Sequence, residues 1–186
     1  PSQNTGLVSD DMYLPTLLVP EDISPEWTFG GFDGIGEASF CDAASIENTF
    51  SPIGWAYGSY SAAGGQWAEQ WVVRLTEPDA QAAMEYARSS LTCDQFSYTS
   101  PEGEVSYWDL QPIQLPVNGG DVHAVQVNIT WENPVYTPYV GTIVFARKGE
   151  YVVALWHYGF SIDPALSAQM AEIAVARFDL VTDNTV

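Results

Sequence analysis

Residues 142–180, TIVFARKGEYVVALWHYGFSIDPALSAQMAEIAVARFDL, decide the fold of this chain. β-Branched and aromatic residues dominate 142–147 and 151–158, and Lys148-Gly149 lies between the two runs. Two strand-like runs joined by two residues that include a glycine predict a β-hairpin.

This hairpin is expected to lie in the middle of a sheet. Closing it at Lys148-Gly149 places Arg147 opposite Glu150 and Phe145 opposite Val152. Both faces of the two strands are apolar, which is typical of strands that are covered on both sides. One face carries Ile143, Phe145, Val152, Ala154 and Trp156, and the other carries Val144, Ala146, Val153 and Leu155.

A helix is predicted directly after the hairpin, with Asp163 as its N-cap and Pro164 as its first residue. Its apolar stripe consists of Leu166, Met170, Ile173, Ala174 and Phe178. This helix is expected to cover one face of the hairpin.

The rest of the chain predicts more strands and one more long helix. Residues 53–62 and 66–75 form a second hairpin around Gly64-Gly65, and Thr76 caps the helix that follows. Strands are also expected at 95–99, 105–110 and 121–131, the last with a clear two-residue period. The prediction is an α+β fold: one antiparallel sheet of about seven strands, with helices mainly on one face. We expect a single domain over residues 1–186 and a frayed tail over 1–9.

The composition excludes several classes of protein. Five basic residues against 24 acidic ones give a net charge of −19, which argues against nucleic acid and anionic lipid as partners. No apolar run is long enough for a transmembrane helix. Because the sequence begins at Pro1 without a methionine, we expect that a signal or lipid anchor has been removed.

The two cysteines, Cys41 and Cys93, match no metal-binding motif, and no metal or cofactor is predicted. Buried free thiols are one interpretation. A disulfide is favoured, because a composition poor in bases and rich in aromatic residues suits an exported protein.

The order of these elements resembles the extracellular sensor domain of mycobacterial PknH-type serine/threonine kinases and related actinobacterial lipoproteins. The residues that carry this resemblance lie within about 40–180. They are EPDAQAAMEYARSSLTC ending at Cys93, VHAVQVNITW at 122–131, and the hairpin-to-helix run from Gly141 to Phe178.

The resemblance implies an exported α+β domain with a cleft for an unidentified ligand. This chain has one cysteine pair where the kinase domains are expected to have two, and Trp156-His157 stands where relatives often place a cysteine. The departure favours a free-standing lipoprotein or secreted domain of the cell envelope.

Aromatic residues are the main candidates for a site, because 13% aromatic content exceeds what one core hides easily. The predicted ligand-binding residues are Trp55, Tyr57, Tyr60, Trp108, Trp156 and His157. The competing interpretation of His157 is a histidine packed in the structure. The competing interpretation of the other rings is that they belong to the core or are scattered over the surface. No motif for a nucleophile or a metal-dependent enzyme occurs.

The sequence therefore predicts an exported, non-catalytic domain that binds a small amphipathic or glycan-like ligand. One alternative is an interaction module that docks a protein partner through the acidic N-terminal third. Residues 1–73 contain ten Asp or Glu and no Lys or Arg. A second alternative is a carbohydrate-active hydrolase, which requires two carboxylates facing each other across a cleft.

Overall fold

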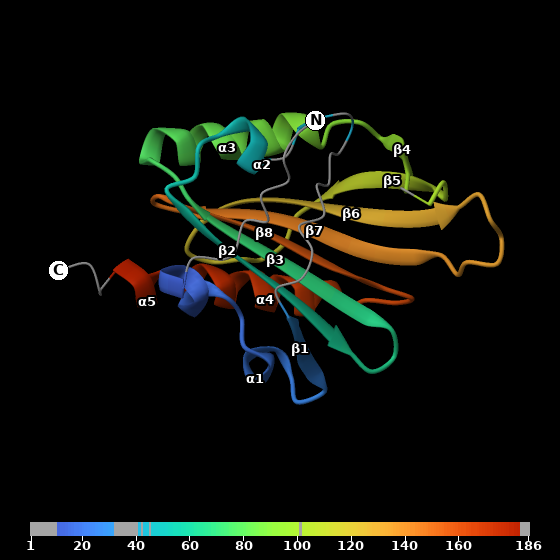
Figure 1. Ribbon diagram of the computed structural model, residues 1–186, viewed down its shortest axis with the longest axis horizontal. Coiled ribbons are helices and arrows are strands. Elements are labelled where there is room, and N and C mark those ends of the chain that lie inside the picture. Colours follow the sequence, from blue (N-terminus) through green and yellow to red (C-terminus); the bar gives the residue numbers. More distant parts are fainter. Residues whose placement is uncertain (1–10, 32–40, 42, 45, 101, 183–186) are drawn as a thin grey trace.

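The computed structural model describes residues 11–31, 41, 43–44, 46–100 and 102–182, so the expected tail at 1–9 lies outside the described residues. Eight strands in this part of the chain form one antiparallel sheet in the order β1-β2-β3-β8-β7-β6-β5-β4 (Figure 1). The predicted α+β class is confirmed. The strands are β1 (Trp27–Gly31), β2 (Gly54–Ala62), β3 (Gln66–Arg74), β4 (Gln95–Thr99), β5 (Val105–Ile113), β6 (Asp121–Trp131), β7 (Tyr139–Lys148) and β8 (Tyr151–Gly159).

The strand that the sequence did not predict is β1, which pairs with the far end of β2 at the edge of the sheet. The segment before it contains the 3₁₀ helix η1 (Asp11–Thr16) and the short helix α1 (Pro20–Ile23). Arg177 fixes this segment, because its guanidinium donates hydrogen bonds to Asp22 at 2.8 Å and to the Pro15 carbonyl at 3.1 Å.

The central hairpin closes one residue later than expected. Lys148 lies opposite Tyr151, and Arg147 lies opposite Val152 rather than Glu150. Gly149 has a φ of 59° in the turn, a left-handed conformation that glycine adopts without a steric penalty. Glu150 is then free to pair with Arg74 of β3 at 2.8 Å. The predicted assignment of apolar residues to the two faces is nevertheless confirmed, because both registers pair residues of the same face.

The two long helices lie on opposite faces of the sheet, which corrects the expectation that helices cover mainly one face (Figure 1). α3 (Glu77–Ser90) packs on one face through Ala83 and Met84. α4 (Pro164–Ala176) packs on the other through Met170 and Ala174. The reason is that β7 and β8 are apolar on both sides and each side needs a cover. The remaining short helices are α2 (Ile46–Thr49) and α5 (Asp179–Thr182).

Both predicted helix caps are present. The Asp163 carboxylate accepts a hydrogen bond from the backbone N–H of Ala165 at 2.9 Å, and the Thr76 hydroxyl accepts one from Asp79 N–H at 3.4 Å. Such caps satisfy backbone donors that the first helical turn leaves unpaired.

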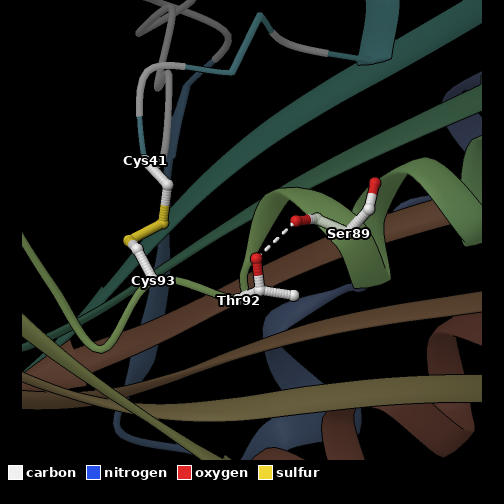
Figure 2. The surroundings of a disulfide bond; sticks show 4 residues. All are labelled: Cys41, Ser89, Thr92 and Cys93. Carbon is white, nitrogen blue, oxygen red and sulfur yellow. Dashed lines mark hydrogen bonds between the residues drawn. A yellow bond between two sulfur atoms is a disulfide. The ribbon is translucent and has the colours of Figure 1, made fainter.

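The predicted disulfide joins Cys41 to Cys93, with the two Cα atoms 5.8 Å apart (Figure 2). Cys93 follows α3, where the Thr92 hydroxyl donates a hydrogen bond of 2.8 Å to the Ser89 carbonyl. The bond therefore ties the segment before α2 to the end of the helix that covers the sheet.

Candidate functional site

The face of the sheet on which α3 packs also holds a cavity of about 250 Å³ between β4 and β8. Its aliphatic wall consists of Val127, Ile129 and Ile143. Six aromatic rings from five strands line it: Tyr98, Trp108, Trp131, Tyr139, Trp156 and Tyr158. Cavities of this size, mostly apolar with a few polar groups, are typical of small-molecule sites.

A glycine in the middle of β7 helps to shape the floor of this cavity. Gly141 lies between Tyr139 and Ile143 on the same face, and it pairs with Val127 on β6 and Tyr158 on β8. A Cβ at this position would lie 2.9 Å from both the His157 carbonyl oxygen and the Tyr158 Cβ. Only glycine fits here, and the missing side chain leaves room between two rings that line the cavity.

The rings are held by contacts with one another. The Trp108 and Trp156 rings meet edge to face at a centroid distance of 6.5 Å, and Trp131 and Tyr139 do so at 4.9 Å. The indole N–H of Trp108 donates a hydrogen bond of 2.9 Å to the Ser106 hydroxyl. These contacts hold the walls of the cavity in fixed positions.

The described lining of the cavity contains one charged residue, Glu104, and the polar residues Ser100, Ser106 and Thr142. Glu104 lines the cavity and accepts a hydrogen bond from the Tyr136 hydroxyl. Glu69 of β3 lies beside the cavity, where its Oε1 accepts a hydrogen bond of 3.0 Å from the Tyr158 hydroxyl. Burial raises the pKa of the Glu69 carboxyl, and the bond from Tyr158 opposes this effect in part.

Two of the six predicted site residues, Trp108 and Trp156, line the cavity. Tyr57 and Trp55 of β2 do not line it. Tyr57 packs against the Trp71 ring at 4.8 Å, and Trp55 packs against the core under α3.

The other two predicted residues belong to the opposite face. The Tyr60 side chain is 2% exposed, and its hydroxyl donates a hydrogen bond of 2.8 Å to the Leu18 carbonyl. His157 is fully buried beside α4, with Nδ1 2.7 Å from the Ser167 hydroxyl and Nε2 3.3 Å from Gln66 Oε1. Alternation along β8 explains this, because His157 must point away from the side that Trp156 and Tyr158 share.

The His157–Ser167 contact joins a base and a hydroxyl, but both side chains are 0% exposed. Burial lowers the pKa of His157 to about 4, so the ring is neutral at pH 7. The pair is closed to any substrate, and we assign it to the packing of α4 on the sheet. In the described part of the chain, no group of three or more His, Cys, Asp or Glu residues is placed to hold a metal ion.

The site residues predicted from the sequence did not include Tyr98, Trp131, Tyr139, Tyr158 or Glu69. The signal for Glu69 was the run Trp67-Ala68-Glu69-Gln70-Trp71, in which a two-residue period places an acid between two tryptophans on one face. The signal for the cavity was Gly141, a glycine inside an otherwise bulky strand.

No protein-family model matches this sequence, and no curated protein matches it significantly. A solved structure does match: the extracellular domain of PknH from Mycobacterium tuberculosis, with a TM-score of 0.65. The match covers 96% of this chain and 99% of that domain at 13% sequence identity. The chain has the fold of the PknH extracellular domain.

The resemblance to PknH that the element order predicted is thus confirmed for the fold. At 13% identity, the similarity to PknH shows how the backbone is arranged and leaves the ligand to be argued from this chain's own side chains. None of the helices among the described residues is both long enough and apolar enough to cross a membrane.

Proposed function

We propose that this chain is an extracytoplasmic, sensor-like domain that binds a small amphipathic ligand in the aromatic cavity and does not transform it. The observation that carries the proposal is the cavity of about 250 Å³ with six rings in its walls. Tryptophan and tyrosine offer large apolar faces with a polar edge, which suits a ligand that has both characters.

Two observations support a location outside the cytoplasm. One is the Cys41–Cys93 disulfide, since such bonds persist in oxidising compartments. The other is the fold shared with an extracellular domain.

Titration with N-phenyl-1-naphthylamine tests the binding proposal, because this probe is uncharged, apolar and fluorescent in dry sites. We expect saturable binding to the wild-type protein. Trp108→Leu and Trp156→Leu each remove a wall, and each is expected to weaken binding about tenfold, or about 1.4 kcal/mol.

Trp55→Leu is the matched control, because Trp55 is a partly exposed tryptophan on the same face that does not line the cavity. Its affinity for the probe should remain within about twofold of wild type. Absence of saturable binding, or an equal loss in all three variants, would refute the proposal.

The two alternative functions predicted from the sequence require different experimental results. A protein partner on the acidic N-terminal third requires binding that Trp108→Leu leaves unchanged and that salt weakens. A hydrolase requires turnover, so release of sugar from envelope glycans would replace the binding proposal.

A further inference from the structure

Glu69 occupies a position that is unusual for a carboxylate. It lies on β3 between Trp67 and Trp71 on the same face, and its direct partner on β8 is Trp156. Its Oε1 accepts the hydrogen bond from the Tyr158 hydroxyl. Rings therefore surround this acid along its own strand and across the neighbouring one.

Among the residues that the structure describes, no basic side chain forms an ion pair with Glu69. The sequence has five basic residues, all of which the structure describes. Four of them form ion pairs with other carboxylates, and the fifth, Arg147, donates to the Gly149 carbonyl at 3.0 Å. The ion pairs of these four residues are Arg74–Glu150, Arg88–Glu85, Arg88–Asp121, Lys148–Asp179 and Arg177–Asp22.

A partly buried carboxylate without a cation is costly, because burial removes water from its charge. Aromatic ring faces do not stabilise an anion, because they carry partial negative charge. The same partial charge attracts a cation. An organic cation placed among these rings would satisfy Glu69 and the ring faces at once. An anionic ligand would lie against Glu104, which lines the cavity, and near Glu69, which is bonded to the lining residue Tyr158, and the described lining contains no basic residue.

We propose that the ligand is an organic cation, an ammonium or quaternary ammonium compound, whose charged head lies at Glu69 and whose apolar body occupies the aromatic cavity. The proposal rests on the proposed function and adds the chemical class of the ligand. Tyr158 connects the two parts, because it lines the cavity and also holds Glu69.

Isothermal titration calorimetry with three probes of equal chain length tests this inference: hexyltrimethylammonium, hexan-1-ol and hexanoate, each in about 150 mM salt so that long-range attraction is screened. We expect the cation to bind at least about tenfold more tightly than the alcohol, and hexanoate to bind most weakly.

The decisive variant is Glu69→Gln, which removes the charge but keeps an oxygen that accepts from Tyr158. It should abolish the preference for the cation and change the affinity for hexan-1-ol by less than about twofold. Glu132→Gln is the matched control, since Glu132 is an exposed acid that does not line the cavity. It removes the same net charge and should preserve the preference.

The outcomes separate this inference from the proposed function. If N-phenyl-1-naphthylamine binds but the cation is not preferred, or if Glu69→Gln retains the preference, the cation proposal is overturned and the binding function stands. If neither the naphthylamine nor any of the three probes binds, both are overturned. Circular dichroism of each variant confirms that a lost preference does not reflect unfolding.

Discussion

Tyr158 of β8 donates a 3.0 Å hydrogen bond to Glu69 of β3, diagonally across two adjacent antiparallel strands on the cavity side of the sheet. Burial raises the pKa of both groups. Each acid therefore holds its proton more tightly than in water, and the ionised form of Glu69 is disfavoured in the unliganded protein. In our proposal, this pair reduces stability and places a charge at the ligand-binding site.

Glu69→Gln is expected to raise the free energy of unfolding of the unliganded protein at pH 7, because the variant removes a carboxylate whose ionised form is disfavoured by burial. Burial raises the pKa of Glu69 in the folded protein above its ordinary value of 4.5. Below pH 4.5 the carboxyl is neutral and its contribution to stability is complete. This contribution is lost as pH rises through the pKa of the folded state. The difference between the variant and the wild type should therefore disappear in acid. Urea unfolding at pH 4 and pH 7 measures this, and a variant that is less stable at pH 7 would contradict the account.

Binding of hexyltrimethylammonium is expected to weaken as pH falls. The reason is that the cation needs the ionised form of Glu69, whose pKa is raised by burial, so the midpoint lies above 4.5. In the described part of the chain, the titratable groups that interact with Glu69 are Tyr57 and Tyr158, and burial raises their pKa values, so they remain neutral over this range. Calorimetry across pH 4–8 measures the midpoint. The same titration of Glu69→Gln should show no midpoint, and a midpoint that survives in the variant would assign the effect to another group.

His157 predicts a separate loss of stability in acid. Its pKa is lowered from 6.5 to about 4 by burial, so the unfolded chain takes up a proton at a higher pH than the folded one. The stabilising effect of neutral His157 is complete above pH 6.5 and is lost progressively toward pH 4, by about 3 kcal/mol in total. Urea unfolding from pH 7 to pH 4 should show this slope. His157→Gln should flatten it, and an unchanged slope in the variant would show that the ring is not the group responsible.

Removing the disulfide is expected to lower the free energy of unfolding by about 4 kcal/mol in the chain-entropy account, because the bond closes a loop with a sequence separation of 52. The double variant Cys41→Ser/Cys93→Ser is the appropriate comparison. Urea unfolding of the variant and of the oxidised wild type measures the difference. A stability equal to wild type would show that the bond does not constrain the unfolded chain.

Local patterns predicted most of the fold. The caps at Thr76 and Asp163 and the apolar stripe of α4 follow from residues close together in sequence, and the structure confirms them. β1 was missed because its five residues follow a proline-rich segment and gain their pairing only from β2, about 30 residues later. The opposite placement of α3 and α4 depends on which face each helix meets, a long-range choice that no local pattern contains.

The site was predicted only in part for a similar reason. Trp108 and Trp156 were chosen for their type, and the structure places both in the cavity wall. Tyr60 and His157 are also aromatic, but strand alternation points them to the other face. Glu69 could be recognised as a candidate only from its hydrogen bond with Tyr158. These two residues are 89 positions apart in the sequence, so no local pattern predicts the contact.

The most direct test of the account is to map the cation onto the seven tryptophans by the NMR signals of their indole N–H groups. We predict that adding hexyltrimethylammonium shifts the signals of Trp108 and Trp156, which line the cavity. The signals of Trp55 and Trp27 should not move, because Trp55 lies outside the cavity and Trp27 packs against His157 on the other face. Unchanged signals for Trp108 and Trp156, or shifts concentrated at Trp27 and Trp55, would contradict the assignment of this cavity as the binding site.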